Sequence, residues 1–98
     1  MTVATTSETT LPSVVKDVGA YVAVRYDGEY FPGMIVEVQE HGAKVKTMIR
    51  AQKTGLLWKW PEKEDVLFYY WVDILRVLDP PVKFSSTRAT FTVSGLPT

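Results

Sequence analysis

Two short runs of alternating residues, joined by Asp27-Gly28, constrain the fold of this chain more than any other feature. Side chains alternate between the two faces of an extended strand, and residues 21–26 follow that period. Asp-Gly is a strong signal for a two-residue hairpin turn, because glycine adopts positive φ at little steric cost. A second strand is therefore predicted over residues 29–38. No stretch of the chain follows the 3.6-residue period of an amphipathic helix, so the sequence predicts an all-β protein.

Pro32 interrupts the second predicted strand and limits where that strand can lie. Proline has no backbone N–H to donate to a neighbouring strand, so it is found on edge strands or at bulges. Gly33 follows directly and favours a bulge, which would let both Ile35 and Val38 face inward. We therefore expect this strand to lie at an edge of the sheet or to contain a bulge near Gly33.

Three further strands are expected downstream, over residues 43–49, 56–60 and 66–71. In the first of them Val45 and Thr47 are expected to face inward, while the intervening lysines point to water. The last two are separated by a loop that contains one proline and four charged residues, which suits a solvated connection.

The segment around Asp73 is too short for an α-helix and predicts a single 3₁₀ turn. Asp73 is expected to cap this turn, although a contact with a ligand cation is the alternative. The run Asp79-Pro80-Pro81 ends the segment. Residues 82–93 then alternate again, and they form either a final strand laid along the barrel or a tail that reaches another domain.

At 98 residues the chain suits one domain with a single core. Residues 1–10 contain five threonines and no aromatic residue, so residues 1–13 are expected to be a flexible leader. We place the domain at residues 14–81 and interpret residues 82–98 as a C-terminal extended strand or tail. The spacing of the strands predicts a small antiparallel barrel of five to six short strands.

Residue types that catalysis and metal binding require are scarce. The chain has no cysteine, which excludes disulfides, thiolate metal sites and cysteine nucleophiles. Its single histidine, His41, lies in an expected hairpin turn. The carboxylates Glu62, Glu64 and Asp65 lack the spacing of a calcium loop or of a two-metal centre. We expect no enzymatic activity, no metal and no cofactor.

The longest apolar run, residues 66–72, contains seven residues. A membrane-spanning helix needs about 20, so no membrane partner is expected. The first fifteen residues also lack the basic start and apolar stretch of a secretory signal. We expect an intracellular protein, with the nucleus as one candidate compartment.

Several motifs between residues 18 and 78 match those of a known family. Residues 19–26 read Gly-Ala-Tyr-Val-Ala-Val-Arg-Tyr, and they are followed by Tyr30-Phe31, Pro32-Gly33 and Ile35, with Asp73-Ile74-Leu75 closing the segment. In these motifs the segment resembles Tudor-type domains of the SH3-like barrel class. Val24 departs from the alanine that is usual in the family. The resemblance implies an SH3-like, Tudor-like barrel that acts as a non-enzymatic binding module.

Single Tudor domains commonly bind methylated lysine or arginine in an aromatic cage, so the resemblance implies a peptide or protein partner such as a histone tail, and a reader role in chromatin. By position, Tyr26 and either Tyr30 or Phe31 match the first two rings of the cage. For the third ring the chain offers an enlarged loop with two tryptophans, which either complete a rearranged cage or leave a fold without methyl-ammonium binding. Asp27 is either a cage acid or a turn residue that bonds its own backbone. The candidate ligand-binding residues are Tyr26, Asp27, Tyr30, Phe31, Trp58 and Trp60.

A nucleic-acid-binding barrel is an alternative from a different class. Residues 42–60 contain basic side chains and no acidic one, and Trp58 and Trp60 could stack on bases. The chain as a whole carries no net charge, so it lacks the global positive field of most nonspecific nucleic-acid binders. The basic candidates are Lys44, Lys46, Arg50 and Lys53.

The aromatic run at residues 68–71 supports a third interpretation, a protein-contact domain of a larger polypeptide. Phe68 and Tyr70 share one face of the predicted strand, and Tyr69 and Trp71 share the other. One pair is expected in the core, and the pair of Tyr69 and Trp71 is a candidate to line a groove or a domain contact.

Overall fold

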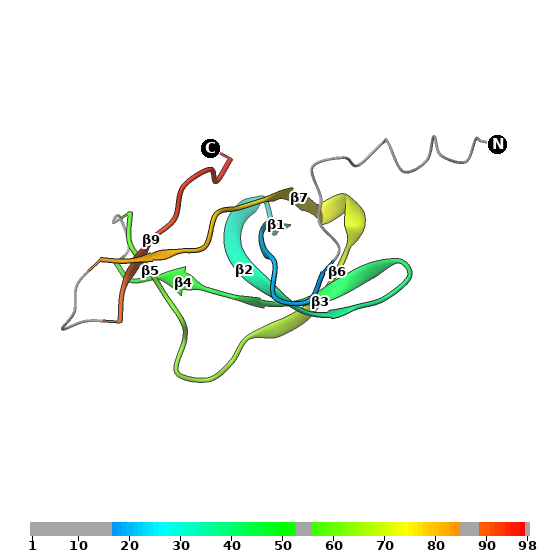
Figure 1. The fold of residues 1–98 in the computed structure, drawn as a ribbon, viewed down its shortest axis with the longest axis horizontal. Coiled ribbons are helices and arrows are strands. Elements are labelled where there is room, and N and C mark those ends of the chain that lie inside the picture. Colours follow the sequence, from blue (N-terminus) through cyan, green and yellow to red (C-terminus); the bar gives the residue numbers. More distant parts are fainter. Residues whose placement is uncertain (1–16, 53–55, 85–88, 98) are drawn as a thin grey trace.

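The computed structural model describes residues 17–52, 56–84 and 89–97, which form two antiparallel sheets (Figure 1). The larger sheet has the strand order β6-β3-β2-β1-β7 and the smaller sheet the order β4-β5-β9-β8. The larger sheet consists of β1 (Tyr21–Tyr26), β2 (Glu29–Val38), β3 (Gly42–Thr47), β6 (Val66–Tyr70) and β7 (Ile74–Val77). The smaller sheet consists of β4 (Ile49–Arg50), β5 (Trp58–Lys59), β8 (Val82–Lys83) and β9 (Phe91–Thr92). The prediction of an all-β fold is confirmed, but β6 and β7 are the two edges of an open five-stranded sheet rather than neighbours in a closed barrel.

The first hairpin forms where the sequence predicts it. Strands β1 and β2 have the predicted bounds, and Tyr26 pairs with Glu29 across the two-residue turn. Asp27 and Gly28 both have positive φ, 53° and 78°, which is the conformation of a type I′ turn. The twist of this turn matches the twist of the flanking strands, so the turn sets the register of the hairpin.

Of the two alternatives that Pro32 suggests, an edge strand or a bulge, the edge is wrong, because β2 lies in the middle of the larger sheet. Pro32 is paired with Ala23 of β1, and its carbonyl oxygen accepts a hydrogen bond of 2.9 Å from the N–H of Met48. Strand β3 ends at Thr47, so the missing N–H of the proline falls where the ladder ends. Proline is tolerated at this central position because one hydrogen bond at most is lost there.

The bulge of β2 also differs in place from the prediction. It lies between Ile35 and Glu37 opposite β3, and not at Gly33. Gly33 has another role, because a Cβ atom there would lie 2.6 Å from Cγ1 of Val45 and 2.7 Å from the carbonyl oxygen of Lys46. The glycine therefore lets β2 and β3 approach closely. Ile35 is buried as predicted, whereas Val38 is exposed.

The core lies under the larger sheet and is made mainly of β-branched side chains. Val45 and Thr47 face inward as predicted. Tyr69 of β6 belongs to this core, whereas Phe68 and Tyr70 are exposed. The face of β6 that carries Tyr69 is therefore the buried one. The buried cluster comprises Val22, Val24, Ile35, Ala43, Val45, Tyr69 and Ile74.

The third predicted strand, residues 43–49, is divided at Met48 between the two sheets. Its first part is β3, and the chain then continues into β4, which begins at Ile49 and belongs to the smaller sheet. Figure 1 shows β4 beside β5, away from the larger sheet. The rings of Phe31 in β2 and Trp58 in β5 meet edge to face, with centroids 6.2 Å apart, so they pack one sheet against the other. Residues 82–93 supply β8 and β9, which pair with each other, and β9 pairs with β5.

The predicted 3₁₀ turn is confirmed as η1 (Trp71–Asp73), between β6 and β7. The expectation that Asp73 caps this turn is wrong, because the N-cap residue is Tyr70 and no side chain bonds the cap. Asp73 instead accepts hydrogen bonds of 3.1 and 3.2 Å from the guanidinium of Arg25. Among the described residues, no helix combines the length and the apolar character needed to cross a bilayer.

Candidate functional site

A cavity of about 230 Å³ opens where the end of β1, the end of β3 and the start of β6 meet. Three aromatic rings line it, those of Tyr26, Phe31 and Tyr69. Tyr26 is 53% exposed and forms the rim, while Tyr69 is only 6% exposed and forms the floor. The cavity is smaller than the 300–1,000 Å³ typical of sites for drug-sized ligands, so its size suits a single small chemical group.

The hairpin and the sheet register bring these rings together. Tyr26 ends β1 and Phe31 lies two pairs along β2, so both project from the same face of the hairpin. Tyr69 comes from β6, and β3 lies between β6 and the hairpin in the sheet. Tyr69 is paired with Ala43 of β3. Trp58 packs against Phe31 on the side of the smaller sheet and so fixes the orientation of that ring.

Tyr69, at the floor of the cavity, is a titratable group whose pKa is shifted by its surroundings. Burial raises the pKa of its phenol above the usual 10.0, and the negative charge of Asp65 acts in the same direction. A side-chain hydrogen bond with Thr47 acts in the opposite direction, and the nearby Tyr26 adds a smaller upward contribution. The phenol is therefore neutral at physiological pH and presents a ring and a hydroxyl group, rather than a charge, to the cavity.

Asp65 supplies the one carboxylate among the lining residues of the cavity, and the described lining includes no lysine or arginine. Its backbone is fixed, since its carbonyl oxygen accepts a hydrogen bond of 3.1 Å from the N–H of Thr47. The remaining walls are apolar and include Met48, whose side chain is fully buried, and Leu67. The cavity thus combines three ring surfaces with an acidic group.

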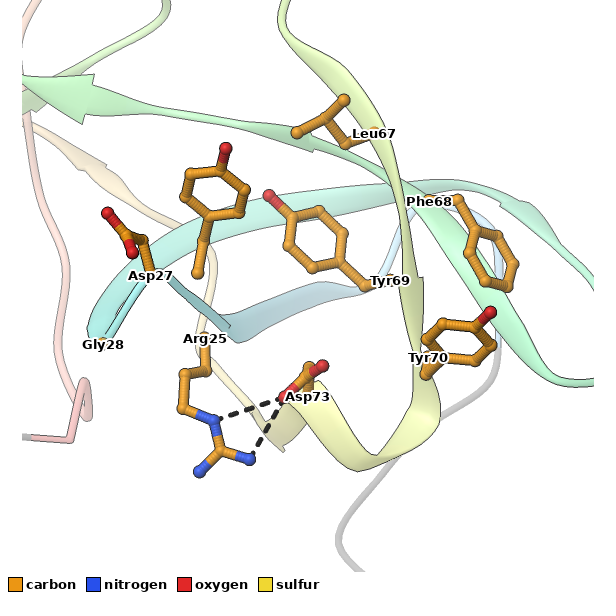
Figure 2. Close-up of a pocket in the computed structure, with 9 residues that line it drawn as sticks. Arg25, Asp27, Gly28, Leu67, Phe68, Tyr69, Tyr70 and Asp73 are labelled. Carbon is orange, nitrogen blue, oxygen red and sulfur yellow. Dashed lines mark hydrogen bonds and ion pairs between the residues drawn. The ribbon is translucent and has the colours of Figure 1, made fainter.

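A second hollow, a groove of about 520 Å³, lies beside the cavity along β6 (Figure 2). It shares Tyr26, Leu67 and Tyr69 with the cavity, so the two hollows adjoin at these side chains. Figure 2 shows Asp27 on one side of the groove and, on the other side, the ring of Tyr69 pointing from β6 into the groove.

The structure brings some of the sequence-predicted residues together and separates others. Tyr26 and Phe31 line the cavity and Asp27 lines the groove. Tyr30 is paired with Arg25 and so lies on the opposite face of the hairpin from Phe31. Trp58 is 4% exposed and lies beneath Phe31 as a core residue, and Trp60 lies outside both hollows.

Both tryptophans are already covered by cations of the chain. The guanidinium carbon of Arg50 lies 5.0 Å from the ring centroid of Trp58, and the ammonium of Lys46 lies 4.9 Å from that of Trp60. Such positions are those of cation–π contacts. These two rings are therefore occupied by side chains from the same protein.

The basic candidates for nucleic-acid binding are also engaged. The ammonium of Lys44 lies 3.8 Å from Glu37, and that of Lys46 lies 3.7 Å from Glu64. Arg50 covers Trp58. Lys53 lies outside the described residues. The three described basic candidates do not form one unpaired positive surface.

Sequence reasoning placed Tyr69 on a face that could line a groove but did not associate it with the first hairpin, and it did not select Asp65 as a binding residue. The available signal was the alternation of residues 66–70, which puts Leu67 and Tyr69 on one face. Alternation alone does not show that β6 pairs with β3, and it is this pairing that brings Leu67 and Tyr69 close to Tyr26.

Within residues 17–52, 56–84 and 89–97, no group of three or more His, Asp or Glu side chains could hold a metal ion. Comparison with protein-family models, with curated proteins and with solved structures finds no match.

Proposed function

We propose that this protein is a non-enzymatic binding module that recognises a peptide through a methylated lysine or arginine side chain. The observation that carries this proposal is the cavity in which Tyr26, Phe31 and Tyr69 surround a space beside the carboxylate of Asp65. This set differs from the cage expected from the sequence, because Tyr69 and Asp65 take the places given to Trp58, Trp60 and Asp27.

The chemistry of the cavity favours an alkylated ammonium or guanidinium group. The face of an aromatic ring carries negative potential, and each ring that contacts a desolvated cation contributes about 0.5–2 kcal/mol. Methyl groups increase the apolar surface of the cation and lower its cost of desolvation, so methylation favours transfer into a cavity with apolar walls such as Met48 and Leu67. Asp65 adds a charge of the opposite sign.

We further propose that the larger sheet is an open variant of the SH3-like, Tudor-like barrel. Support comes from the strand order β6-β3-β2-β1-β7 and from the 3₁₀ turn η1 between the two edge strands. The smaller sheet is then an addition, inserted between β3 and β6 and completed by β8 and β9. The cavity lies where this addition joins the larger sheet, since Ile49 of β4 is among its lining residues.

The test is a titration of the protein with one lysine-containing peptide in unmodified and trimethylated forms, followed by calorimetry and by amide chemical shifts. The trimethylated peptide is expected to bind about tenfold more tightly, and its largest shifts are expected at Tyr26, Asp65 and Leu67. Asp65→Asn should weaken binding of the trimethylated peptide.

Glu62→Gln is the matched control, because Glu62 is an exposed carboxylate of the same loop that does not line the cavity. This variant is expected to bind like the wild type. Equal and weak binding of both peptides, or equal effects of the two variants, would contradict the methyl-dependent function.

A further inference from the structure

Strand β6 forms a free edge of the larger sheet, since its pairing partner in the described structure is β3 alone. Two hydrogen bonds fix which of its backbone groups face β3: the N–H of Thr47 donates to the carbonyl of Asp65 at 3.1 Å, and the N–H of Trp71 donates to the carbonyl of His41 at 3.2 Å. Hydrogen-bonded and non-hydrogen-bonded pairs alternate along an antiparallel ladder.

With these two ends fixed, the register assigns the backbone groups between them. Leu67 and Tyr69 bond to β3, and Val66, Phe68 and Tyr70 direct their N–H groups to the free edge. Backbone donors and acceptors at an open edge are a template for one more strand.

The groove beside the cavity runs along this edge, because four consecutive residues of β6, residues 67–70, line one of its walls. The opposite wall comes from the end of β1 and its turn, including Asp27. Figure 2 shows Phe68 and Tyr70 on one side of β6 and Tyr69 on the other. A volume of about 520 Å³ is enough for several residues of an extended chain and falls within the usual range for ligand sites.

The charges of the two hollows favour a cationic occupant. Their linings include three carboxylates, Asp27, Asp65 and Asp73, and one guanidinium, Arg25, which is paired with Asp73. Asp27 and Asp65 are therefore left to balance a positive charge brought by a ligand.

We propose that a basic peptide binds in extended form and adds to β6 as an extra strand, with its methylated side chain in the cavity. This inference rests on the proposed function and adds the backbone mode of recognition to it. Main-chain bonds to Phe68 and Tyr70 supply affinity that is independent of peptide sequence, and the cavity selects the modified side chain. Leu67 and Tyr69 border both hollows, so a side chain that the added strand directs to this face of β6 lies next to the cavity.

The substitution Tyr70→Pro tests the backbone mode. Tyr70 has φ −69°, which proline adopts without strain, and its N–H points to the free edge, so the ladder with β3 keeps its hydrogen bonds. Tyr70→Ala is the matched control, because it removes the same 61%-exposed side chain and retains the N–H. We expect Tyr70→Pro to bind the trimethylated peptide about tenfold more weakly than Tyr70→Ala.

A second ligand separates this inference from the proposed function. Free trimethyllysine can fill the cavity without extending along β6, so both variants are expected to bind it like the wild type. If wild-type protein binds free trimethyllysine but the two variants bind the peptide equally, the added strand is wrong and the proposed function stands. If wild-type protein binds neither ligand, the proposed function itself fails.

Two further measurements cover the remaining outcomes. If Tyr70→Pro does not fold, peptides that are N-methylated at single backbone positions replace this variant as the test. N-methylation at alternate peptide residues is expected to weaken binding. A uniform small effect at all positions would overturn the inference. A concentration-dependent dimer of the wild type that Tyr70→Pro abolishes, with peptide affinity unchanged, would assign the edge to a second copy of the chain and overturn the inference.

Discussion

Two groups of aromatic rings, the two tryptophans Trp58 and Trp60 and the three rings of the cavity, differ in what covers them. Trp58 and Trp60 have Arg50 and Lys46 over their rings at 5.0 and 4.9 Å. The rings of the cavity face a carboxylate instead, and no basic residue is among its described lining. Aromatic surface that already holds a cation of its own chain stabilises the fold, whereas aromatic surface with an acidic neighbour and an opening to solvent is suited to a cation from outside.

The largest effect that would sharpen this contrast is a loss of stability from Trp58→Ala. Trp58 is 4% exposed and packs on Phe31 at 6.2 Å, so its removal leaves a cavity between the sheets. The free energy of unfolding should fall by about 3–5 kcal/mol, measured by chemical denaturation. Leu56→Ala, at a side chain 84% exposed, should change it by less than about 0.5 kcal/mol. Similar losses for both would show that Trp58 is not a core residue.

The next effect concerns ligand binding and separates the two groups of rings directly. Tyr26→Ala removes the exposed rim of the cavity, and it should weaken binding of free trimethyllysine about tenfold. Trp60→Ala should leave that affinity unchanged, because Trp60 does not line the cavity. Both affinities can be measured by calorimetry. A larger loss for Trp60→Ala would transfer the binding role to the tryptophans.

A smaller effect is expected from the cation over Trp58. Arg50→Ala removes the exposed partner of the cation–π contact on Trp58 and should lower the free energy of unfolding by roughly 0.5–1 kcal/mol. Lys59→Ala is the control, because Lys59 is an exposed base of the neighbouring strand. Thermal denaturation of the two variants should separate them. If they lose the same stability, the position of Arg50 over the ring contributes nothing.

The smallest effect appears at high pH and comes from the floor of the cavity. Burial raises the pKa of Tyr69 above 10.0, so the unfolded chain releases this proton at a lower pH than the folded protein does. The stability that the neutral phenol contributes is fully present below pH 10.0 and is lost as the pH rises from there through the folded pKa. Tyr69→Phe should flatten this decline in denaturation curves recorded from pH 8 to about 11. An unchanged decline would place its origin in other residues.

The first hairpin was predictable from sequence because its information is local. Alternation over six residues and an Asp-Gly pair define β1, the turn and the start of β2 without any knowledge of the remaining chain. The 3₁₀ turn at Asp73 was predictable for the same reason, since the double proline limits the segment. The role of Asp73 was not, because its partner Arg25 lies 48 residues away.

The remaining errors have a common physical cause, namely strand pairing over long distances in the sequence. Pro32 is acceptable in a central strand only because β3 ends opposite it, and a proline alone does not reveal where its neighbour ends. The cage was expected from Trp58 because an enlarged loop carries it, but pairing of β5 with β4 turns that ring under Phe31. Tyr69, the third ring of the cavity, is positioned by the register in which β6 pairs with β3.

The passage of the chain through Met48, from β3 into β4, makes one short segment part of both the cavity and the junction between the sheets. Thr47 ends β3, Ile49 begins β4 and Met48 lies between them, and all three residues line the cavity. The shape of the cavity therefore depends on how the two sheets pack together. Strands β8 and β9 belong to the smaller sheet, so the C-terminal segment contributes to the packing that shapes a cavity it does not line.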